Sequence, residues 1–293
     1  MTPLSILLIL VSSLLHSSWN FLSKKGNWRV EFFFWVFFWG TIFYLPFFIA
    51  FGVFPSFLVQ SPPKLWWLVI PSGFFETIYF VCLIEAYREG DLSFVYPVSR
   101  SAPLFTQIWA VLFIGETLSG GGVLGIVLVM IGLFVVSLKD FRYHPMISPS
   151  RHFTSRPYLL ALSAAVASSI YSVIDKVGVQ ILHPVFYLWL INFWMSVDTG
   201  LYLLLRRNSS FLSVWRDSKR EIFIIAFLQN VAYLLVLMAM QMSKVSYVVA
   251  FRQVGALFGA VMGIVLLKEG SWKTRMTGVL ILTLGLLLIG LSK

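Results

Sequence analysis

Ten stretches of mainly apolar residues dominate this sequence. An α-helix rises 1.5 Å per residue, so about 20 apolar residues are needed to cross the roughly 30 Å of hydrocarbon in a bilayer. Because lipid offers no partner to backbone N–H and C=O groups, stretches of this kind must be helical. The sequence therefore predicts an all-α integral membrane protein with ten transmembrane helices. The stretches are residues 3–23, 32–53, 65–87, 93–114, 121–138, 158–177, 184–205, 221–241, 246–267 and 274–291.

Composition supports the membrane assignment and removes a nucleic-acid partner. Charged residues make up 12% of the chain, the apolar fraction is 59% and the mean hydropathy is +0.87, whereas soluble proteins carry about 25% charged residues. A net charge of +10 would favour nucleic acid in a soluble protein. Here the basic residues lie between the apolar stretches, as is typical of membrane proteins. We therefore expect the lipid bilayer, and no nucleic acid, as a partner.

The chain repeats itself at a shift of 153 residues, most clearly at polar and glycine positions. The first repeat is expected over residues 1–138, the second over 157–293, and the Pro-containing stretch 139–156 reads as a linker. Five spans per repeat place the second copy in the membrane with the opposite orientation, which predicts two inverted five-helix repeats around a central cavity. The coinciding pairs include Ser93 with Ser246, Glu116 with Glu269, Gly125 with Gly278 and Gly132 with Gly285.

The distribution of Lys and Arg predicts the orientation. Of the 22 basic residues, sixteen lie on the loops that follow spans one, three, five, seven and nine. Cytoplasmic loops are enriched in Lys and Arg, so we expect these loops inside and both termini on the non-cytoplasmic side of the cell (inner) membrane. The other six are Lys64, Lys176, Lys244 and Lys293 on the opposite side, and Arg100 and Arg252 within spans.

Residues 85–93 and 96–100 carry a family resemblance, which continues through 111–116 and the glycine-rich fifth span. These segments resemble EamA-type members of the drug/metabolite transporter superfamily, and a looser second copy covers 265–269, Gly278 and Gly285. The resemblance extends over nearly the whole chain except the linker. It implies a basket of helices around a central cavity lined mainly by helices 1, 3, 4, 6, 8 and 9. It does not identify the cargo.

Arg100, Arg252 and Glu76 lie inside spans, where burial costs at least ~2.5–3.5 kcal/mol and usually marks a wet cavity or a partner. Arg100 shares one face of the fourth span with Gln107, and Arg252 lies beside Gln253 in the ninth. Glu76 lies within about 6 Å of the depth of Arg100. The two can form a structural ion pair or bracket a zwitterion; alternatively, Arg100 binds backbone carbonyls.

Polar stripes mark the first and sixth spans. Ser12, His16, Asn20 and Lys24 recur every four residues, and Tyr171 belongs to the stripe of the sixth span. Stripes of this kind face other helices or water. His16 either couples transport to protons or packs as a hydrogen-bonded histidine.

Several smaller expectations concern single residues. Asp175, beside Lys176, is interpreted as a boundary ion pair, and Glu116 as a cap of its own turn. The aromatic run 32–39 is expected to face lipid. Pro97 should bend the fourth span, whereas the ninth span, which has no proline at the equivalent position, should stay straight. The candidate substrate-binding residues are His16, Asn20, Glu76, Tyr79, Tyr96, Arg100, Gln107, Tyr171, Gln229, Tyr233, Arg252 and Gln253.

These features predict a transporter, most simply an exporter of a small polar or zwitterionic metabolite such as an amino acid, working by alternating access. The alternative is a flippase for a lipid-linked sugar or another amphiphile, which would need a cavity open to lipid. The sequence contains no metal-ligand cluster, nucleophile motif or phosphate-binding loop. We therefore expect neither an enzyme, nor a cofactor, nor a bound metal.

Overall fold

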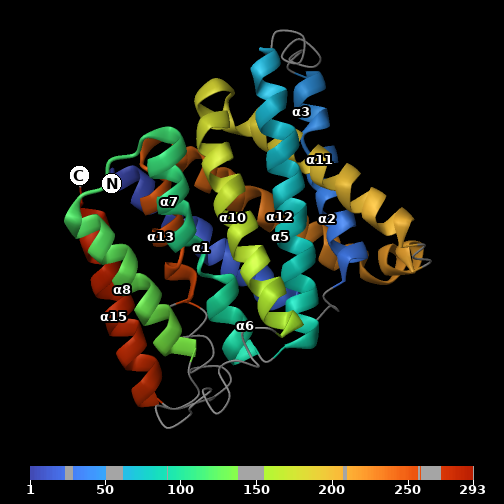
Figure 1. Ribbon diagram of the computed structural model, residues 1–293. Coiled ribbons are helices and arrows are strands. Elements are labelled where there is room, and N and C mark those ends of the chain that lie inside the picture. Colours follow the sequence, from blue (N-terminus) through green and yellow to red (C-terminus); the bar gives the residue numbers. More distant parts are fainter. Residues whose placement is uncertain are drawn as a thin grey trace.

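The computed structural model describes residues 1–23, 29–50, 62–90, 92–137, 155–206, 210–256, 258 and 272–292. Every regular element in these ranges is a helix (Figure 1). The first half contains α1 (Pro3–Ser23), α2 (Val30–Ile42), α3 (Leu45–Ala50), the 3-10 helix η1 (Pro63–Leu65), α5 (Trp66–Glu89), α6 (Leu92–Ser99), α7 (Ala102–Ile114) and α8 (Gly120–Ser137). The second half contains α10 (Arg156–Ile181), α11 (Pro184–Leu205), α12 (Phe211–Met242), α13 (Val245–Phe251) and α15 (Trp272–Leu291).

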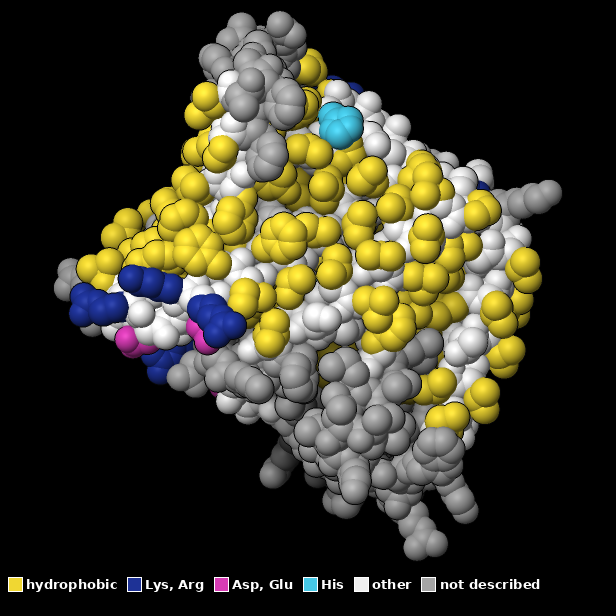
Figure 2. All heavy atoms as spheres, turned by 180° about the vertical axis from the view of Figure 1, so that it is seen from behind, with side chains coloured by type: hydrophobic (Ala, Val, Ile, Leu, Met, Phe, Trp, Pro, Cys, Tyr) yellow, Lys and Arg dark blue, Asp and Glu magenta, His cyan; other side chains and the backbone are white. Residues whose placement is uncertain are grey.

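Most helices follow the predicted spans closely. Within the described residues, five helices are long and apolar enough to cross a membrane, and three shorter apolar helices accompany them. Large apolar side chains cover much of the outer surface (Figure 2), for example Trp67 at 81% and Leu204 and Leu205 at 77% exposure. Apolar patches of this extent are expected against lipid and are rare on soluble monomers. The chain is therefore a multi-pass membrane protein. The predicted linker, up to residue 154, and the second part of the ninth span, residue 257 and residues 259–267, lie outside the described residues.

Both the fourth and the ninth span are interrupted midway. Helix α6 ends at Ser99 and α7 begins at Ala102, whereas α13 ends at Phe251, before Arg252 and Gln253 in a turn. The prediction of a bend in the fourth span alone is wrong. Proline explains the first break. At the second, two hydroxyls of α1 bind carbonyls around the turn: Ser13 Oγ donates to Arg252 O at 3.5 Å and Ser17 Oγ to Gly255 O at 3.2 Å.

Helices of the two halves pack against each other in matching pairs. Helix α5 packs on α10, and α12 packs on α1; α2 packs on α11, and α8 on α15 (Figure 1). Glycines permit the close approach of α8 and α15, because a Cβ on Gly132 would lie 2.4 Å from the backbone nitrogen of Leu282. The contact of Gly125 with the carbonyl of Gly285 has its counterpart in that of Gly278 with the carbonyl of Gly132.

The aromatic run in α2 is largely internal, contrary to the expectation that it faces lipid. Phe32, Phe33 and Phe37 are buried, and Phe33 and Phe37 lie 5.2 and 5.0 Å from the ring of Phe80 on α5. The reason is the position of α2, which packs against α5, α11 and α12 and so has little surface left for lipid.

The end of the bundle that carries both chain termini is held by polar contacts between distant segments. The amino terminus of Met1 donates to Ser292 O at 2.9 Å. Glu116 accepts from the backbone nitrogen of Val245 at 2.6 Å and from Ser246 Oγ at 2.7 Å. The expectation that Glu116 caps its own turn is thus wrong. Glu116 caps the start of α13 in the other half, because packing of the two halves brings that helix end next to its carboxylate.

Candidate functional site

A cavity of about 40 Å³ lies in the interior of the bundle. A water molecule occupies about 30 Å³ of liquid, so the cavity is contracted and holds little more than one. Its walls come from α1, α5, α10, α11 and α12, together with Arg252. The lining residues are Ser12, His16, Trp19, Glu76, Tyr79, Phe80, Tyr171, Leu188, Ile191, Asn192, Met195, Gln229, Asn230, Ala232, Tyr233 and Arg252.

One acidic and one basic side chain, Glu76 and Arg252, line this cavity. Glu76 on α5 is buried, and its Oε1 has no hydrogen-bond partner among the described residues. The guanidinium of Arg252, which also lines the cavity, lies 5.6 Å from the ring centre of Tyr233. Gln229 on α12, at the position equivalent to Glu76, also presents a side-chain oxygen that lacks a partner within the described part of the chain. Unsatisfied buried acceptors are costly, so these oxygens are available to a polar ligand.

Aromatic rings form one wall. The rings of Tyr79 and Tyr171 lie 5.9 Å apart, those of Tyr171 and Tyr233 lie 6.3 Å apart, and both pairs meet edge to face. Such rings attract a cation to their faces and exclude water from the charges beside them. The wall is therefore suited to an ammonium group held next to Glu76.

Asp175 is the residue that sequence reasoning placed wrongly. It is fully buried and accepts hydrogen bonds from Tyr187 OH at 2.9 Å, from Ser72 Oγ and from Tyr233 OH. Lys176 is not its partner: Lys176 Nζ donates to Met240 O at 2.5 Å. The boundary interpretation fails because α10 extends to Ile181, so Asp175 still lies inside the bundle. The polar stripe of the sixth span, which reaches Asp175 at helical spacing, was the signal for this position.

Arg100 lies next to the cavity but does not pair with Glu76 in the described structure. Its Nη2 lies 3.3 Å from His16 Nε2, and its guanidinium lies 5.4 Å from the ring centre of Tyr96. Because a guanidinium only donates, His16 Nε2 is the acceptor. The expected Glu76–Arg100 ion pair is therefore wrong, since the break after Ser99 turns Arg100 toward α1.

The structure divides the predicted site residues into two groups. Lining the cavity are His16, Glu76, Tyr79, Tyr171, Gln229, Tyr233 and Arg252, while Tyr96, Arg100, Gln107 and Gln253 do not line it. The side chain of Asn20 lies outside the described residues.

Sequence reasoning also missed an amide pair in the cavity wall. Asn192 Nδ2 on α11 donates to Asn230 Oδ1 on α12 at 2.8 Å. No sequence signal identified this pair, because the two helices are brought together only by packing.

Comparison with known proteins agrees with this architecture. Apolar helices around a cavity lined by charged and aromatic side chains define a multi-pass membrane protein with an internal polar site. The chain belongs to the EamA-like transporter family, whose model matches residues 3–138 and 155–291, one match for each half.

Two individual proteins are similar to this chain. An uncharacterized protein of Methanocaldococcus jannaschii is 30% identical over 83 residues, which is 28% of this chain and 61% of that protein. A solved crystal structure, described only as that of a protein, superposes with a TM-score of 0.71 at 16% identity, covering 97% of this chain and 95% of the other. At that identity the likeness shows the fold alone.

Proposed function

We propose that this protein transports a small zwitterionic solute, such as an amino acid, across the cell (inner) membrane. The observation that carries the proposal is that Glu76 and Arg252 line one cavity beside three tyrosines, and that Glu76 Oε1 has no hydrogen-bond partner among the described residues. A carboxylate and aromatic faces suit an ammonium group, and a guanidinium suits a carboxylate. The presence of both charges in the lining of a single small cavity favours a cargo that carries both.

Movement of the helices is part of the proposal, because a cavity of about 40 Å³ is too small for such a cargo in this conformation. The breaks at Arg100 and Arg252 supply places where the fourth and ninth spans can hinge. We infer alternating access by two inverted repeats, residues 1–138 and 157–293, joined by the linker 139–156. The matching helix pairs α5–α10 and α12–α1 support this symmetry, as do the reciprocal glycine contacts of α8 and α15.

Export is the favoured direction. The basic loops predict that the chain termini lie outside, and the terminal end is the one held by Glu116, Lys176 and Met1. In this proposal the terminal end is the closed one, so the cavity opens toward the cytoplasm and takes up its cargo there. The flippase alternative needs a cargo-sized cavity open to lipid, and the central cavity is small and internal.

Proteoliposome uptake tests the proposal. Purified protein is reconstituted, and uptake of a panel of amino acids, amines and carboxylates is measured with and without a pH gradient. We expect amino acids to be transported and to lose at least ten-fold in rate in Glu76→Gln and Arg252→Gln protein, because each loses a charged contact worth about 1.5–3 kcal/mol. Glu89→Gln is the matched control, since Glu89 lies on the same helix but pairs with Arg156 at 2.8 Å on the surface. Unchanged uptake in Glu76→Gln protein would refute the assignment.

A further inference from the structure

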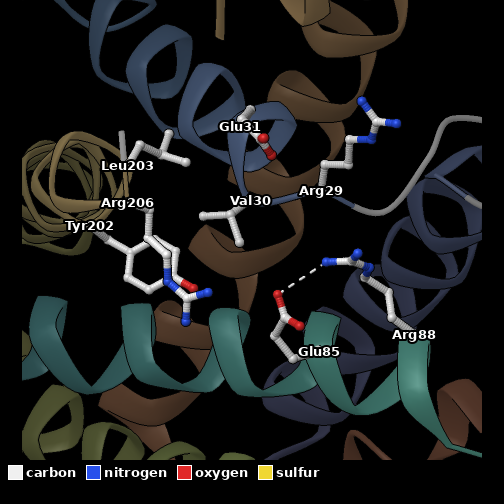
Figure 3. A pocket seen from close by; sticks show the side chains of 8 residues that line it. All are labelled: Arg29, Val30, Glu31, Glu85, Arg88, Tyr202, Leu203 and Arg206. Atoms are coloured by element: carbon white, nitrogen blue, oxygen red, sulfur yellow. Dashed lines mark hydrogen bonds and ion pairs between the residues drawn. The ribbon is translucent and has the colours of Figure 1, made fainter. Parts of the chain in front are cut away.

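A second, larger cavity lies at the opposite end of the bundle from the chain termini. It has a volume of about 270 Å³ and is bounded by the start of α2 and the ends of α5 and α11 (Figure 3). Glu85, in its wall, lies nine residues beyond Glu76 on α5 (85 − 76), or about 14 Å along the helix. The cavity is therefore separate from the central site.

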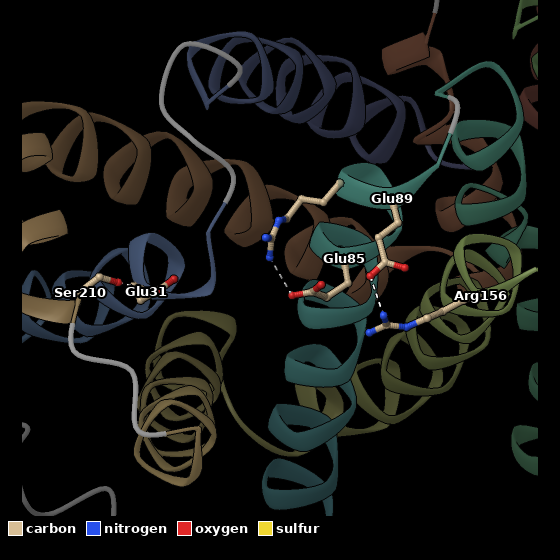
Figure 4. A network of polar contacts seen from close by, with 6 residues as sticks. Glu31, Glu85, Glu89, Arg156 and Ser210 are labelled. Atoms are coloured by element: carbon tan, nitrogen blue, oxygen red, sulfur yellow. Dashed lines mark hydrogen bonds and ion pairs between the residues drawn. The ribbon is translucent and has the colours of Figure 1, made fainter.

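Arginines set its charge. Arg29, Arg88 and Arg206 line the cavity with two carboxylates, both of which have partners (Figures 3 and 4). Glu85 accepts from Arg88 at 3.2 Å, and Glu31 accepts from Ser210 Oγ at 2.9 Å. Among the described residues, neither Arg29 nor Arg206 forms an ion pair; the Arg206 guanidinium lies 5.1 Å from the ring centre of Tyr202. Formally, the wall carries one net positive charge and two guanidinium groups without a carboxylate, which favours an anionic ligand.

The surroundings point to a lipid rather than a soluble anion. On α11, next to the lining residues, Leu201, Leu204 and Leu205 are 55–77% exposed. An acyl chain can therefore lie along α11 while its headgroup enters the cavity. The neighbouring start of α12 carries the exposed residues Arg216, Lys219 and Arg220. In a bilayer these residues gather anionic lipids near the cavity through the surface charge of the membrane, an attraction that is absent in detergent.

We propose that this cavity binds the phosphate headgroup of an anionic membrane lipid such as a phosphatidylglycerol. At about 30 Å³ per water, its 270 Å³ corresponds to about nine water molecules, which is enough for a glycerophosphate headgroup. Arg29 and Arg206 contact the phosphate, and the acyl chains extend along the exposed leucines of α11. Because α2 and α5 belong to the first half and α11 to the second, the bound lipid joins the two halves at this end.

Lipid binding to the purified full-length protein in detergent tests this proposal without any measurement of transport. Retention of phosphatidylglycerol and phosphatidylcholine is compared by native mass spectrometry, with glycerol 3-phosphate and inorganic phosphate as soluble probes. We expect phosphatidylglycerol to be retained over phosphatidylcholine and the soluble anions not to compete at equal concentration. Equal retention of the two lipids would overturn the proposal. Displacement by soluble phosphate at the lipid's concentration would also overturn it, since it would show a site for a free anion.

Charge-matched variants locate the site. Arg29→Gln/Arg206→Gln protein should lose at least ten-fold in affinity for phosphatidylglycerol, whereas Arg216→Gln/Arg220→Gln protein, which loses the same charge on exposed residues at the same end, should lose less than three-fold. Equal losses would indicate a diffuse surface effect and contradict the proposal. Glu85→Gln releases Arg88 from its ion pair and should increase the affinity, a gain that misfolding cannot produce. A weaker affinity in Glu85→Gln protein would count against the site.

Discussion

The two halves of the molecule share a framework but contribute different chemistry. In both, the fourth helix of the half is broken near an arginine, at Arg100 and at Arg252, and a glycine-containing last helix packs on its counterpart. Within the cavity the correspondence ends. The position that holds Glu76 on α5 holds Gln229 on α12, and both line the same space.

The comparison shows which features can be the same in both halves and which cannot. Backbone packing can be repeated, because each copy of α8 or α15 needs only a glycine where the other approaches. Charges cannot be repeated as freely, since both copies would face one shared cavity. A glutamate in place of Gln229 would add a third carboxylate to Glu76 and Asp175, which already interact, and like charges at close range oppose ionisation. The amide keeps the polar contact without the repulsion.

Exchanging the acid between the halves gives the largest expected effect on transport. Glu76→Gln alone should cut uptake roughly a hundred-fold, at the upper end of the cost of a lost charged hydrogen bond. The double variant Glu76→Gln/Gln229→Glu restores one carboxylate to the cavity from the opposite wall, so we expect part of the rate to return. If the double variant takes up solute no faster than the single variant, the wall on which the carboxylate lies matters as much as the presence of the carboxylate.

The shared framework is tested at the glycines. Gly132→Ala should destabilise the protein by about 1–3 kcal/mol, because a Cβ would lie 2.4 Å from the backbone of Leu282 and would force α8 away from α15. Thermal unfolding in detergent measures the effect. Gly120→Ala, on the same helix, is the matched control, since an added Cβ there meets nothing within 4 Å. Equal melting temperatures for the two variants would show that the close contact does not limit stability.

A smaller effect on stability is expected at Asp175, which the second half contributes. Asp175→Asn weakens hydrogen bonds from Ser72, Tyr187 and Tyr233, so we expect a loss of about 1 kcal/mol. Asp198→Asn, at a half-buried position on α11, should change stability less. If the two variants melted alike, Asp175 would behave as the boundary residue that the sequence suggested.

Much of the fold was predictable, and less of the site. The spans at 3–23 and 184–205 coincide with α1 and α11, since a run of apolar residues must become a helix in lipid. Seven of the twelve predicted site residues line the cavity, because polar and charged side chains inside a span cannot face lipid at low cost. Arg100 and Asp175 were assigned wrong partners. Local sequence shows neither the direction of the chain after a helix break nor the residue at which α10 ends.

The sequence by itself determined that the chain is a helical membrane protein of repeated halves, because hydropathy and spacing act locally and an apolar run of about 20 residues crosses lipid as a helix. Only the tertiary structure decided which polar groups come together: Glu76 and Arg252 at one cavity, Arg100 with His16, and Glu116 with the start of α13. These contacts join segments more than eighty residues apart. Their geometry depends on how whole helices rotate and approach, which packing alone determines.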